Sequence, residues 1–532
     1  MIKRLRFYLA LISAILKKDK RKISFGLITA LLLLFILKVI LPVIAPQAVS
    51  TYKEFRKPTF VEGAVGKPVH PNPLFDKSET QKEISQLVFR SLISVDKKGN
   101  LVGDLAKNFK KISETEYIFY LKKNIFWHDG VRFTSDDVLY TVKIAQDPRY
   151  ESVVSSNFKD VAVEKLDDYT IKFKLREPFA PFPFATTVGI IPKHVPLKKY
   201  KPIGTGSFRV KSITKERIVL ASKKLNVIFR FYMNFKDAKI ALKLGEIHAL
   251  GGFTPQEVSE IKKFGNKNIY QHVLPYRQAI IFFNTRADPL KSKEVRQALT
   301  YSINKVSIAQ LAGGEAAVIS GNQLPLISWV TGTKKDRYEL NLEEAKKLLK
   351  RVGFEFTKDS WQKKDKKLAV TIISADDPEL NTIVNMLKES WTGLGLVVKS
   401  KTQDVESLHK EIIPNRSFQI LVDFQEIPPD PDQYVLWHTT QVRETNITGI
   451  SSANLDKLLE DARKVDDVKK RGESYNLFTT LLADEAPAVF LYYPQYIWFV
   501  SKKVHGVDLT NFTTPFDRFA SYKKWRIDKG YF

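Results

Sequence analysis

Residues 124–143 read NIFWHDGVRFTSDDVLYTVK, a stretch crowded with residue types that serve chemistry as well as architecture. Asp129 and Gly130 stand between runs rich in aromatic and β-branched residues. This pattern predicts a tight turn between extended segments, with the glycine in the left-handed conformation. Thr134 lies three residues before Asp137, and this spacing predicts the capped start of a helix. The local pattern therefore favours a turn and a capped helix over an active site or a metal site.

Length and composition indicate a large folded protein. The chain has 532 residues, of which 44% are hydrophobic and 12% aromatic. These values predict roughly two to four folded domains rather than a disordered chain. The absence of cysteine from the sequence excludes disulfides, thiolate catalysis, cysteine-based zinc sites and a lipid-modified N-terminal cysteine.

A long apolar stretch near the N-terminus predicts a membrane anchor. Residues 23–45 read ISFGLITALLLLFILKVILPVIA. As a helix they cover roughly 35 Å, enough to span a hydrocarbon core of about 30 Å. Because basic residues precede the stretch, the N-terminus is predicted to be cytoplasmic and the rest of the chain extracytoplasmic. A cleaved signal peptide is the alternative, but no small-x-small site follows Ala45, so we favour a single-pass anchor in the cell membrane.

Part of the high net charge belongs to the N-terminal residues that flank the predicted membrane anchor. The net charge is +27, and residues 1–57 hold twelve Lys or Arg against two acids, a surplus of ten that leaves +17 for the remaining 475 residues. The sequence has no arginine-rich block, recognition-helix pattern or Cys/His finger, so we predict no nucleic-acid partner. The scattered lysines are interpreted as facing solvent, anionic lipid or cell-wall polymer.

Beyond residue 58 the sequence alternates runs of strand length and helix length. Helices are predicted over residues 83–95, 235–245, 293–308, 340–352, 380–394, 454–464 and 468–483, and strands over 117–120, 161–168, 170–175, 227–232, 279–284, 368–373, 396–401 and 488–493. Gly245 is the predicted end of the second helix, and Asn341 is the predicted cap of the fourth. The alternation predicts an α/β fold.

The sequence contains no coherent catalytic set. Its eight histidines lack the i, i+3 or i, i+4 spacing of a helical metal site. Ser-x-x-Lys occurs at Ser212 and Ser302, but among 85 basic residues such matches are expected by chance, and the companion motifs are missing. We therefore predict that the protein is not an enzyme, has no catalytic residues and uses no metal and no cofactor.

The order of several segments is more specific than any one of them. These segments are GNLVGDLAKNF at 99–109, IFWHDGVRFTSDDVLYTV at 125–142, GIIPKHV at 189–195, PIGTGSFRV at 202–210, ALKLGEIHA at 241–249, FFNTRADPLKSKEVRQALTYSINK at 282–305 and PDPDQY at 429–434. Together they resemble the extracytoplasmic solute-binding proteins of family 5, the oligopeptide-, dipeptide- and nickel-binding components of ABC importers. The likeness extends from about Val61 to the end of the chain.

The chain departs from the family pattern in two places. The family usually carries a lipidated cysteine or a cleaved signal, whereas this chain keeps an apolar N-terminal stretch. Residues 245–248 read GEIH where GEID is common, and we assign no function to His248.

The resemblance implies a two-lobed α/β clamp like the type II periplasmic binding proteins, with an inserted subdomain and an N-terminal transmembrane helix. The implied division is residues 1–57 for tail, anchor and stalk; residues 58–85, 203–285 and 488–532 for a discontinuous lobe I; residues 86–202 for the inserted subdomain II; and residues 286–487 for lobe III. In this frame Trp127 is interpreted as a packing anchor of subdomain II.

The function implied by the resemblance is peptide binding for import. The predicted protein closes its lobes about a hinge on an oligopeptide or dipeptide and presents it to the permease subunits of an ABC transporter. A membrane tether would keep it close to that permease. Three alternatives stay open: an exported sensing or chaperone module that has lost transport, a clamp for a solute other than a peptide, and a serine hydrolase using one of the Ser-x-x-Lys matches.

The resemblance also implies where a ligand binds. An α-ammonium buried in the cleft needs an acid, which peptide-binding members supply from the segment that resembles FQEIPPDPDQY at residues 424–434. Asp430 and Asp432 are the predicted partners, with Glu426 as the alternative register. The competing interpretation makes Asp430 and Asp432 turn residues around Pro431.

Four further residues are predicted near the ligand. Tyr276 precedes a strongly apolar strand, and Ala64 and Val65 lie in the first strand. Ligand contacts in the family cluster in these two regions. Trp437 is predicted either as a pocket wall or as a core residue.

Overall fold

The computed structural model describes residue 10 and residues 57–263, 265–330 and 336–528. The predicted anchor at residues 23–45 lies outside the described residues. In the part of the chain that is described, no helix is both long enough and apolar enough to cross a membrane. Most of the described residues belong to one compact unit, and that unit contains all the contacts discussed below.

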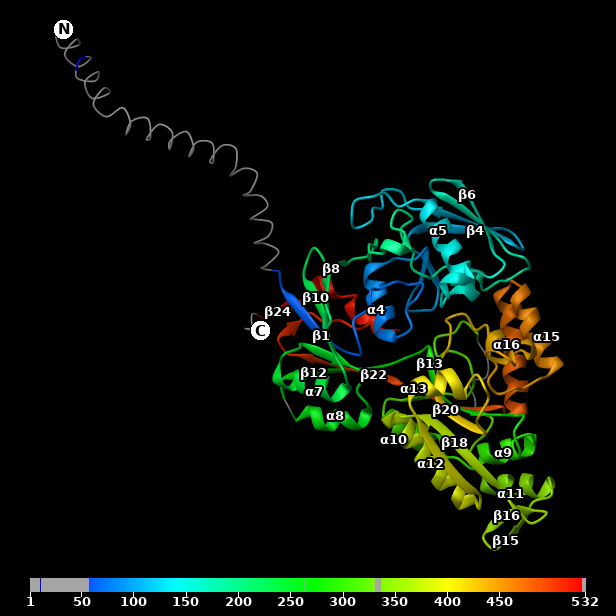
Figure 1. The fold of residues 1–532 in the computed structure, drawn as a ribbon. Coiled ribbons are helices and arrows are strands. Elements are labelled where there is room, and N and C mark those ends of the chain that lie inside the picture. The colour runs from blue at the N-terminus through cyan, green and yellow to red at the C-terminus, as the bar shows by residue number, and fades with distance from the viewer. Residues whose placement is uncertain (1–9, 11–56, 264, 331–335, 529–532) are drawn as a thin grey trace. The chain divides into compact units, whose positions relative to one another are not determined.

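The first sheet joins the beginning and the end of the described chain. Its seven strands run in the order β12 (Lys267–Val273), β22 (Gln495–Ser501), β11 (Ala249–Gly251), β1 (Thr59–Val65), β10 (Asn226–Tyr232), β9 (Arg217–Ala221) and β8 (Arg209–Ile213). β1 pairs in parallel with β11, and β22 pairs antiparallel with both β11 and β12. The sheet is therefore built from segments far apart in sequence, as Figure 1 shows for β1 and β22.

Helices α7 (Phe235–Leu244) and α8 (Pro255–Lys262) share a hydrophobic cluster with this sheet. α7 ends at Gly245, whose φ of 80° is the left-handed conformation that glycine adopts at low cost. The predicted end of this helix is thus confirmed.

The second sheet is the more deeply buried one. Its six strands run in the order β14 (Val318–Ile319), β21 (Ala488–Tyr493), β13 (Arg277–Phe283), β20 (Ile420–Glu426), β18 (Ala369–Ala375) and β19 (Val397–Gln403). All six residues of β21 and the last six of β13 are buried, as expected for strands that are covered on both faces.

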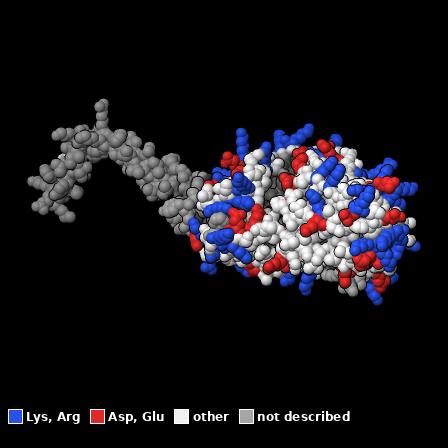
Figure 2. Space-filling view, turned by 90° about the horizontal axis from the view of Figure 1, so that it is seen from below, with Lys and Arg blue, Asp and Glu red and all other residues white. Residues whose placement is uncertain are grey.

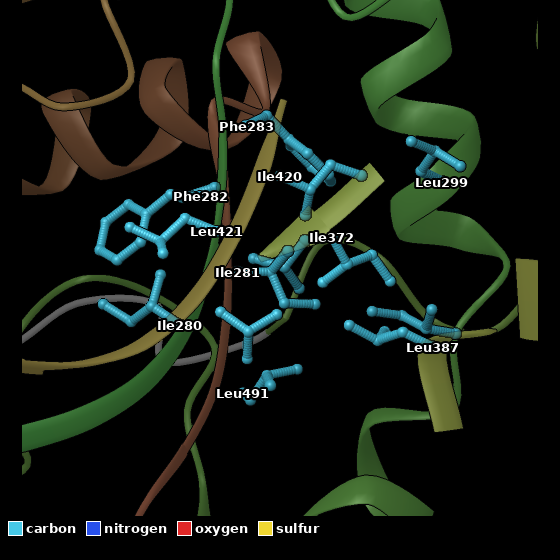
Figure 3. Packing of buried hydrophobic residues seen from close by; sticks show 14 of the residues in the cluster. Ile280, Ile281, Phe282, Phe283, Leu299, Ile372, Leu387, Ile420, Leu421 and Leu491 are labelled. Atoms are coloured by element: carbon cyan, nitrogen blue, oxygen red, sulfur yellow. The ribbon is translucent and has the colours of Figure 1, made fainter. Parts of the chain in front are cut away.

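A large apolar core holds this sheet and its helices together. Figure 3 shows Ile280, Ile281, Phe282 and Phe283 of β13 in this core, with Leu387 of α12 (Pro378–Leu394) among their neighbours.

A third, smaller sheet lies in the region predicted as subdomain II. Its strands run in the order β4 (Ala106–Ser113), β5 (Glu116–Leu121), β7 (Thr170–Lys174) and β6 (Ala162–Asp167). Helix α5 (Ser135–Gln146) begins after the predicted cap residue Thr134, whose N–H donates to Asp137 Oδ2 at 3.0 Å. Gly130 has a φ of 90°, and a single bridge joins Phe126 and Arg132 across the turn. The turn and the capped helix predicted here are confirmed.

Two predicted helices are interrupted. The helix predicted over 83–95 is α4 (Glu79–Val88), and the residues after it form the strand β2 (Ile93–Val95), which pairs with β3 (Leu101–Gly103). The helix predicted over 293–308 is split into α9 (Lys293–Tyr301) and α10 (Lys305–Gly313). The break occurs because Asn304 caps a new helix by accepting from the Ser307 N–H.

The remaining elements complete the layers around the sheets. They are α6 (Phe182–Ala185), α11 (Leu342–Arg351), α13 (Val405–Ser407), α14 (Tyr434–Trp437), α15 (Ala453–Lys464), α16 (Val468–Glu485), β15 (Glu355–Thr357), β16 (Ser360–Lys363), β17 (Lys366–Lys367), β23 (Val504–His505) and β24 (Arg526–Ile527). Asn341 caps α11 as predicted, with its side chain accepting from the Glu344 N–H.

The sheets suggest where the chain passes between lobes. β13 and β21 fall in ranges predicted for lobe I, yet both pair within the six-stranded sheet. We therefore propose that the two connections between the lobes, here called passages, are residues 274–276 and residue 494. The two passages are adjacent, because the Leu274 N–H donates to the Pro494 carbonyl at 2.8 Å.

Surface charge is mixed on the face that Figure 2 shows. Lys and Arg side chains there are interspersed with Asp and Glu over the described residues. On that face the basic residues do not form one continuous positive patch of the kind that binds the phosphate backbone of a nucleic acid.

Candidate functional site

A cavity of about 400 Å³ opens beside the carboxyl end of β1. Its lining comes from β1, α4, β10, α7, β11 and β22, from residues within 274–277 and Glu426, and from residues within the C-terminal segment 513–518. Residues attached to both large sheets therefore face one space. The volume lies in the range of small-molecule sites, which is about 300–1,000 Å³.

Two of the predicted pocket residues form the wall on the side of β1. Ala64 is buried, and Val65 is 43% exposed. β1 and β11 pair at Glu62 and Ala249, and Ala64 and Val65 follow this pair along β1. Opposite them, Gly251 brings its backbone close to Tyr496, since a Cβ at Gly251 would lie 1.9 Å from the Tyr496 hydroxyl. Ala64 and Val65 thus lie at the end of β1 that borders the cavity.

The cavity is strongly charged. Its acids are Glu62, Glu79, Glu83 and Glu426, and its cations are Lys82, Arg277 and Arg518. Such a lining suits a ligand that carries both positive and negative groups better than an apolar one.

Two of the ion pairs in this cavity are partly exposed. Lys82 Nζ lies 2.8 Å from Glu79 Oε1 on the first turns of α4. Arg277 Nε lies 3.4 Å from Glu426 Oε1, where β13 and β20 are neighbours in the six-stranded sheet. These charges can rearrange when a ligand arrives, because their side chains still reach solvent.

The third group of charges in the cavity is buried. Arg518 Nη2 donates to Glu83 Oε2 at 2.8 Å, and Arg518 Nε lies 3.5 Å from Glu62 Oε1. The Trp498 indole donates to the same Glu62 oxygen at 3.0 Å. Burial raises the pKa of Glu62 to about 7, although Arg518 opposes this rise.

Tyr276 joins this cavity to a larger one. The second cavity measures about 720 Å³ and shares Lys82, Gln86, Tyr276, Thr513, Thr514 and Phe516 with the first. Tyr276 is buried, its hydroxyl has no hydrogen-bond partner within the described chain, and burial raises its pKa to about 12. The two cavities therefore form one cleft with Tyr276 at the junction.

Asp430 and Asp432 are engaged elsewhere. Asp430 forms a two-point ion pair with Arg471 of α16, at 2.8 and 3.1 Å, and Asp432 pairs in the same way with Arg463 of α15. Each carboxylate also accepts a backbone N–H two residues further on, from Asp432 and Tyr434 respectively. Neither acid lines the two cavities as the described residues form them.

The segment after Glu426 is fastened to the cleft wall by other contacts. The Ile427 N–H donates to the Tyr276 carbonyl at 2.7 Å. Trp437 is 2% exposed, packs 6.0 Å from the Phe490 ring and belongs to the large core, so it contacts neither cavity.

Glu62, Arg518 and Tyr496 also line the cavity but were not predicted from the sequence. Glu62 could have been noticed as a lone acid inside an otherwise apolar strand, because a buried carboxylate needs a reason to be there. Arg518 carries no such signal, since its partners come from the first strand and α4. Within the described part of the chain, no group of three or more metal-ligating side chains is found.

Comparison with known proteins identifies a matching family. The model of the family described as "Bacterial extracellular solute-binding proteins, family 5 Middle" matches residues 100–446. This match confirms the resemblance inferred from the order of the sequence motifs.

Individual relatives cover most of the chain. The oligopeptide-binding protein AppA of Bacillus subtilis is 27% identical over 468 residues, which are 82% of this chain and 86% of that protein. The dipeptide-binding protein of Escherichia coli is 24% identical over 499 residues, which are 84% of this chain and 91% of that protein.

A solved structure gives the same result for the fold. The ABC transporter substrate-binding protein CtaP of Listeria monocytogenes superposes with a TM-score of 0.78 at 25% identity, covering 89% of this chain and all of that one. The described chain thus has the two-lobed α/β fold that was predicted.

Proposed function

Because the chain belongs to the bacterial extracellular solute-binding proteins of family 5, we propose that it binds a peptide in the cleft joined at Tyr276 and delivers it to an ABC importer. Proteins of this family bind solutes and are not enzymes. The observation that carries the proposal is one cleft lined from both large sheets, with the end of β1 along its wall.

The chemistry of the cleft supports a peptide in particular. The backbone at Ala64 and Val65 can pair with an extended ligand without regard to its side chains. The cavity of about 720 Å³ offers room for side chains. The curated relatives named above are an oligopeptide-binding and a dipeptide-binding protein, which is the same ligand class.

We assign the predicted site residues to two roles. Ala64, Val65, Tyr276 and Glu426 are proposed to contact the ligand, because all four line the cleft. Asp430, Asp432 and Trp437 are proposed to hold the segment that follows Glu426.

The division of roles follows from electrostatics. Asp430 and Asp432 are already compensated by arginines and therefore offer a ligand ammonium little net attraction.

The location of the protein is part of the proposal. We propose that residues 23–45 anchor the chain in the cell membrane with the N-terminus in the cytoplasm and the cleft outside. The support is the length of the apolar stretch and the basic residues before it.

Peptide binding is tested on the full-length chain purified in detergent. In a library of peptides from two to ten residues, we expect at least one to raise Tm by roughly 2–6 °C when present at a hundredfold excess over Kd. Calorimetric titration should give the same affinity. A library in which no peptide changes Tm or releases heat would contradict the proposal.

A matched pair of variants locates the binding site. Val65 and Val102 are 43% and 41% exposed, but only Val65 lines the cleft. Val65→Trp should abolish the peptide-dependent shift by filling the cavity, while Val102→Trp should retain it. Equal binding by both variants would place the peptide elsewhere.

A further inference from the structure

In the smaller cavity, one carboxylate remains without a cation of its own when the acids and the cations that line the cavity are paired. Lys82 pairs with Glu79, and Arg277 pairs with Glu426. The remaining cation, Arg518, serves both Glu83 and Glu62. The cavity therefore carries one more acid than it has cations.

The surplus acid is Glu62, because Arg518 is committed to other partners. Arg518 donates Nη2 to Glu83 and Nη1 to the Pro515 carbonyl, while its Nε makes no hydrogen bond within the described chain. The distance of 3.5 Å between that Nε and Glu62 Oε1 is long for a charge-assisted hydrogen bond.

One oxygen of Glu62 is buried without a partner. Oε1 accepts from the Trp498 indole, but Oε2 has no hydrogen-bond partner among the residues that the structure describes. Glu62 is 1% exposed and lines the cavity. A buried carboxylate oxygen in this state costs free energy unless a proton or a cation reaches it.

The environment of Glu62 favours the arrival of positive charge. Burial, helped by the neighbouring Glu83, raises the pKa of Glu62 to about 7 although Arg518 and the Trp498 indole oppose the rise, so this carboxyl accepts a proton near neutral pH. A cation that fits the cavity would compensate the charge more completely than Arg518 does at 3.5 Å.

We propose that Glu62 forms a subsite for a protonated amine of the ligand, with Oε2 accepting a hydrogen bond from the ammonium group. This inference rests on the proposed function, because the amine belongs to a peptide bound in the cleft. An ammonium supplies both the positive charge and the N–H donor that Oε2 lacks. The amine can come from the N-terminus of the peptide or from a lysine side chain.

The first part of the test uses the wild-type full-length chain and four peptides. These are Ala-Lys-Ala-Ala-Ala, its N-acetylated form, Ala-norleucine-Ala-Ala-Ala and the N-acetylated form of that peptide. Norleucine keeps the four-carbon side chain of lysine but lacks the ammonium. We expect the removal of one of the two amines to weaken binding about 10- to 100-fold, which also identifies the source of the amine.

The second part assigns that loss to Glu62. In Glu62→Gln the side chain keeps its size and an acceptor for Trp498. Because this variant lacks the charged partner of the ammonium, we expect the difference in affinity between the paired peptides to shrink to less than about threefold. Glu343→Gln is the matched control, because Glu343 is likewise paired with a lysine, Lys346, but lies on α11 and lines neither cavity. This control should keep the full difference.

The outcomes separate the two proposals. If the peptides bind but neither amine matters in the wild type, or if Glu62→Gln retains the full difference, the ammonium subsite is wrong while peptide binding stands. If none of the four peptides, nor any in the library, binds the wild type, both the proposed peptide binding and the proposed subsite are wrong. The comparison among peptides on the wild type needs no variant to fold.

Discussion

At the residue scale, the acids around Pro431 show how a charge can look available in the sequence and be neutralised in the fold. Asp430 is 2% exposed, and burial raises its pKa while Arg471 opposes that rise. Arg471 also stacks 5.0 Å from Trp329. The arginine is therefore held by both charge and packing, and its removal from the pair would leave a buried, uncompensated partner.

Asp430→Ala should destabilise the protein by about 3–5 kcal/mol, because it leaves the Arg471 guanidinium buried without its partner. Urea unfolding followed by fluorescence measures this loss. Asp461→Ala, at an exposed position of α15, should change the free energy of unfolding by less than about 0.5 kcal/mol.

The double variant Asp430→Ala, Arg471→Met separates structure from binding. It should recover part of the lost stability and still bind peptide. Loss of peptide binding in a stably folded double variant would instead restore Asp430 as the partner of the ligand ammonium.

At the element scale, helix α5 shows how one side chain can organise a subdomain. Asp137 Oδ2 accepts from the Thr134 N–H and from the Trp127 indole, the latter at 3.2 Å, and Oδ1 accepts from the Lys193 N–H at 2.9 Å. The carboxylate thus ties the start of the helix to the turn before it and to a segment more than fifty residues later. Trp127 is 2% exposed and packs as the anchor that the sequence predicted.

Asp137→Ala should cost about 2–4 kcal/mol of stability, since it leaves several buried donors without an acceptor. Asp136→Ala is the matched control, because Asp136 is the adjacent acid and pairs with Lys165 and Lys193 at the surface. Its cost should stay below about 1 kcal/mol. Thermal and urea unfolding of both variants measure the difference, and equal losses would contradict the role given to Asp137.

At the scale of the whole molecule, two kinds of contact link the parts that surround the cleft. The passages at 274–276 and 494 lie side by side through the Leu274 to Pro494 hydrogen bond. Away from them, Lys111 of β4 pairs with Asp466, and the Ala180 N–H donates to the Arg463 carbonyl at 2.7 Å. We propose that contacts of the second kind break and re-form while the two passages act as a hinge.

We expect peptide to shift the distance between Lys107→Cys in β4 and Glu389→Cys in α12 when both carry spin labels. Both positions are exposed, and the sequence has no native cysteine to interfere. Electron–electron double resonance should show a broad distribution that narrows and moves to shorter distances with saturating peptide. The pair Lys107→Cys and Lys143→Cys lies within subdomain II and should not change. An unaltered distribution for the first pair would argue against hinge closure.

The local elements and the family can be predicted without coordinates. The start of α5, the cap of α11 and the glycine end of α7 depend on neighbours within a few residues, so their signals are complete in the sequence. The order of the motifs likewise needs no coordinates. The helix predicted over 293–308 failed only where Asn304 introduced a competing cap.

Which acids are available for a ligand depends on contacts between distant parts of the chain. Asp430 finds its arginine 41 positions away, and Glu62 meets Trp498 across 436 positions. Charge compensation and burial act through space between side chains that folding brings together, and no local pattern encodes them. For this reason the acids that stood out in the sequence are neutralised, while the surplus carboxylate lies at Glu62, in a strand where the resemblance implied only Ala64 and Val65 near the ligand.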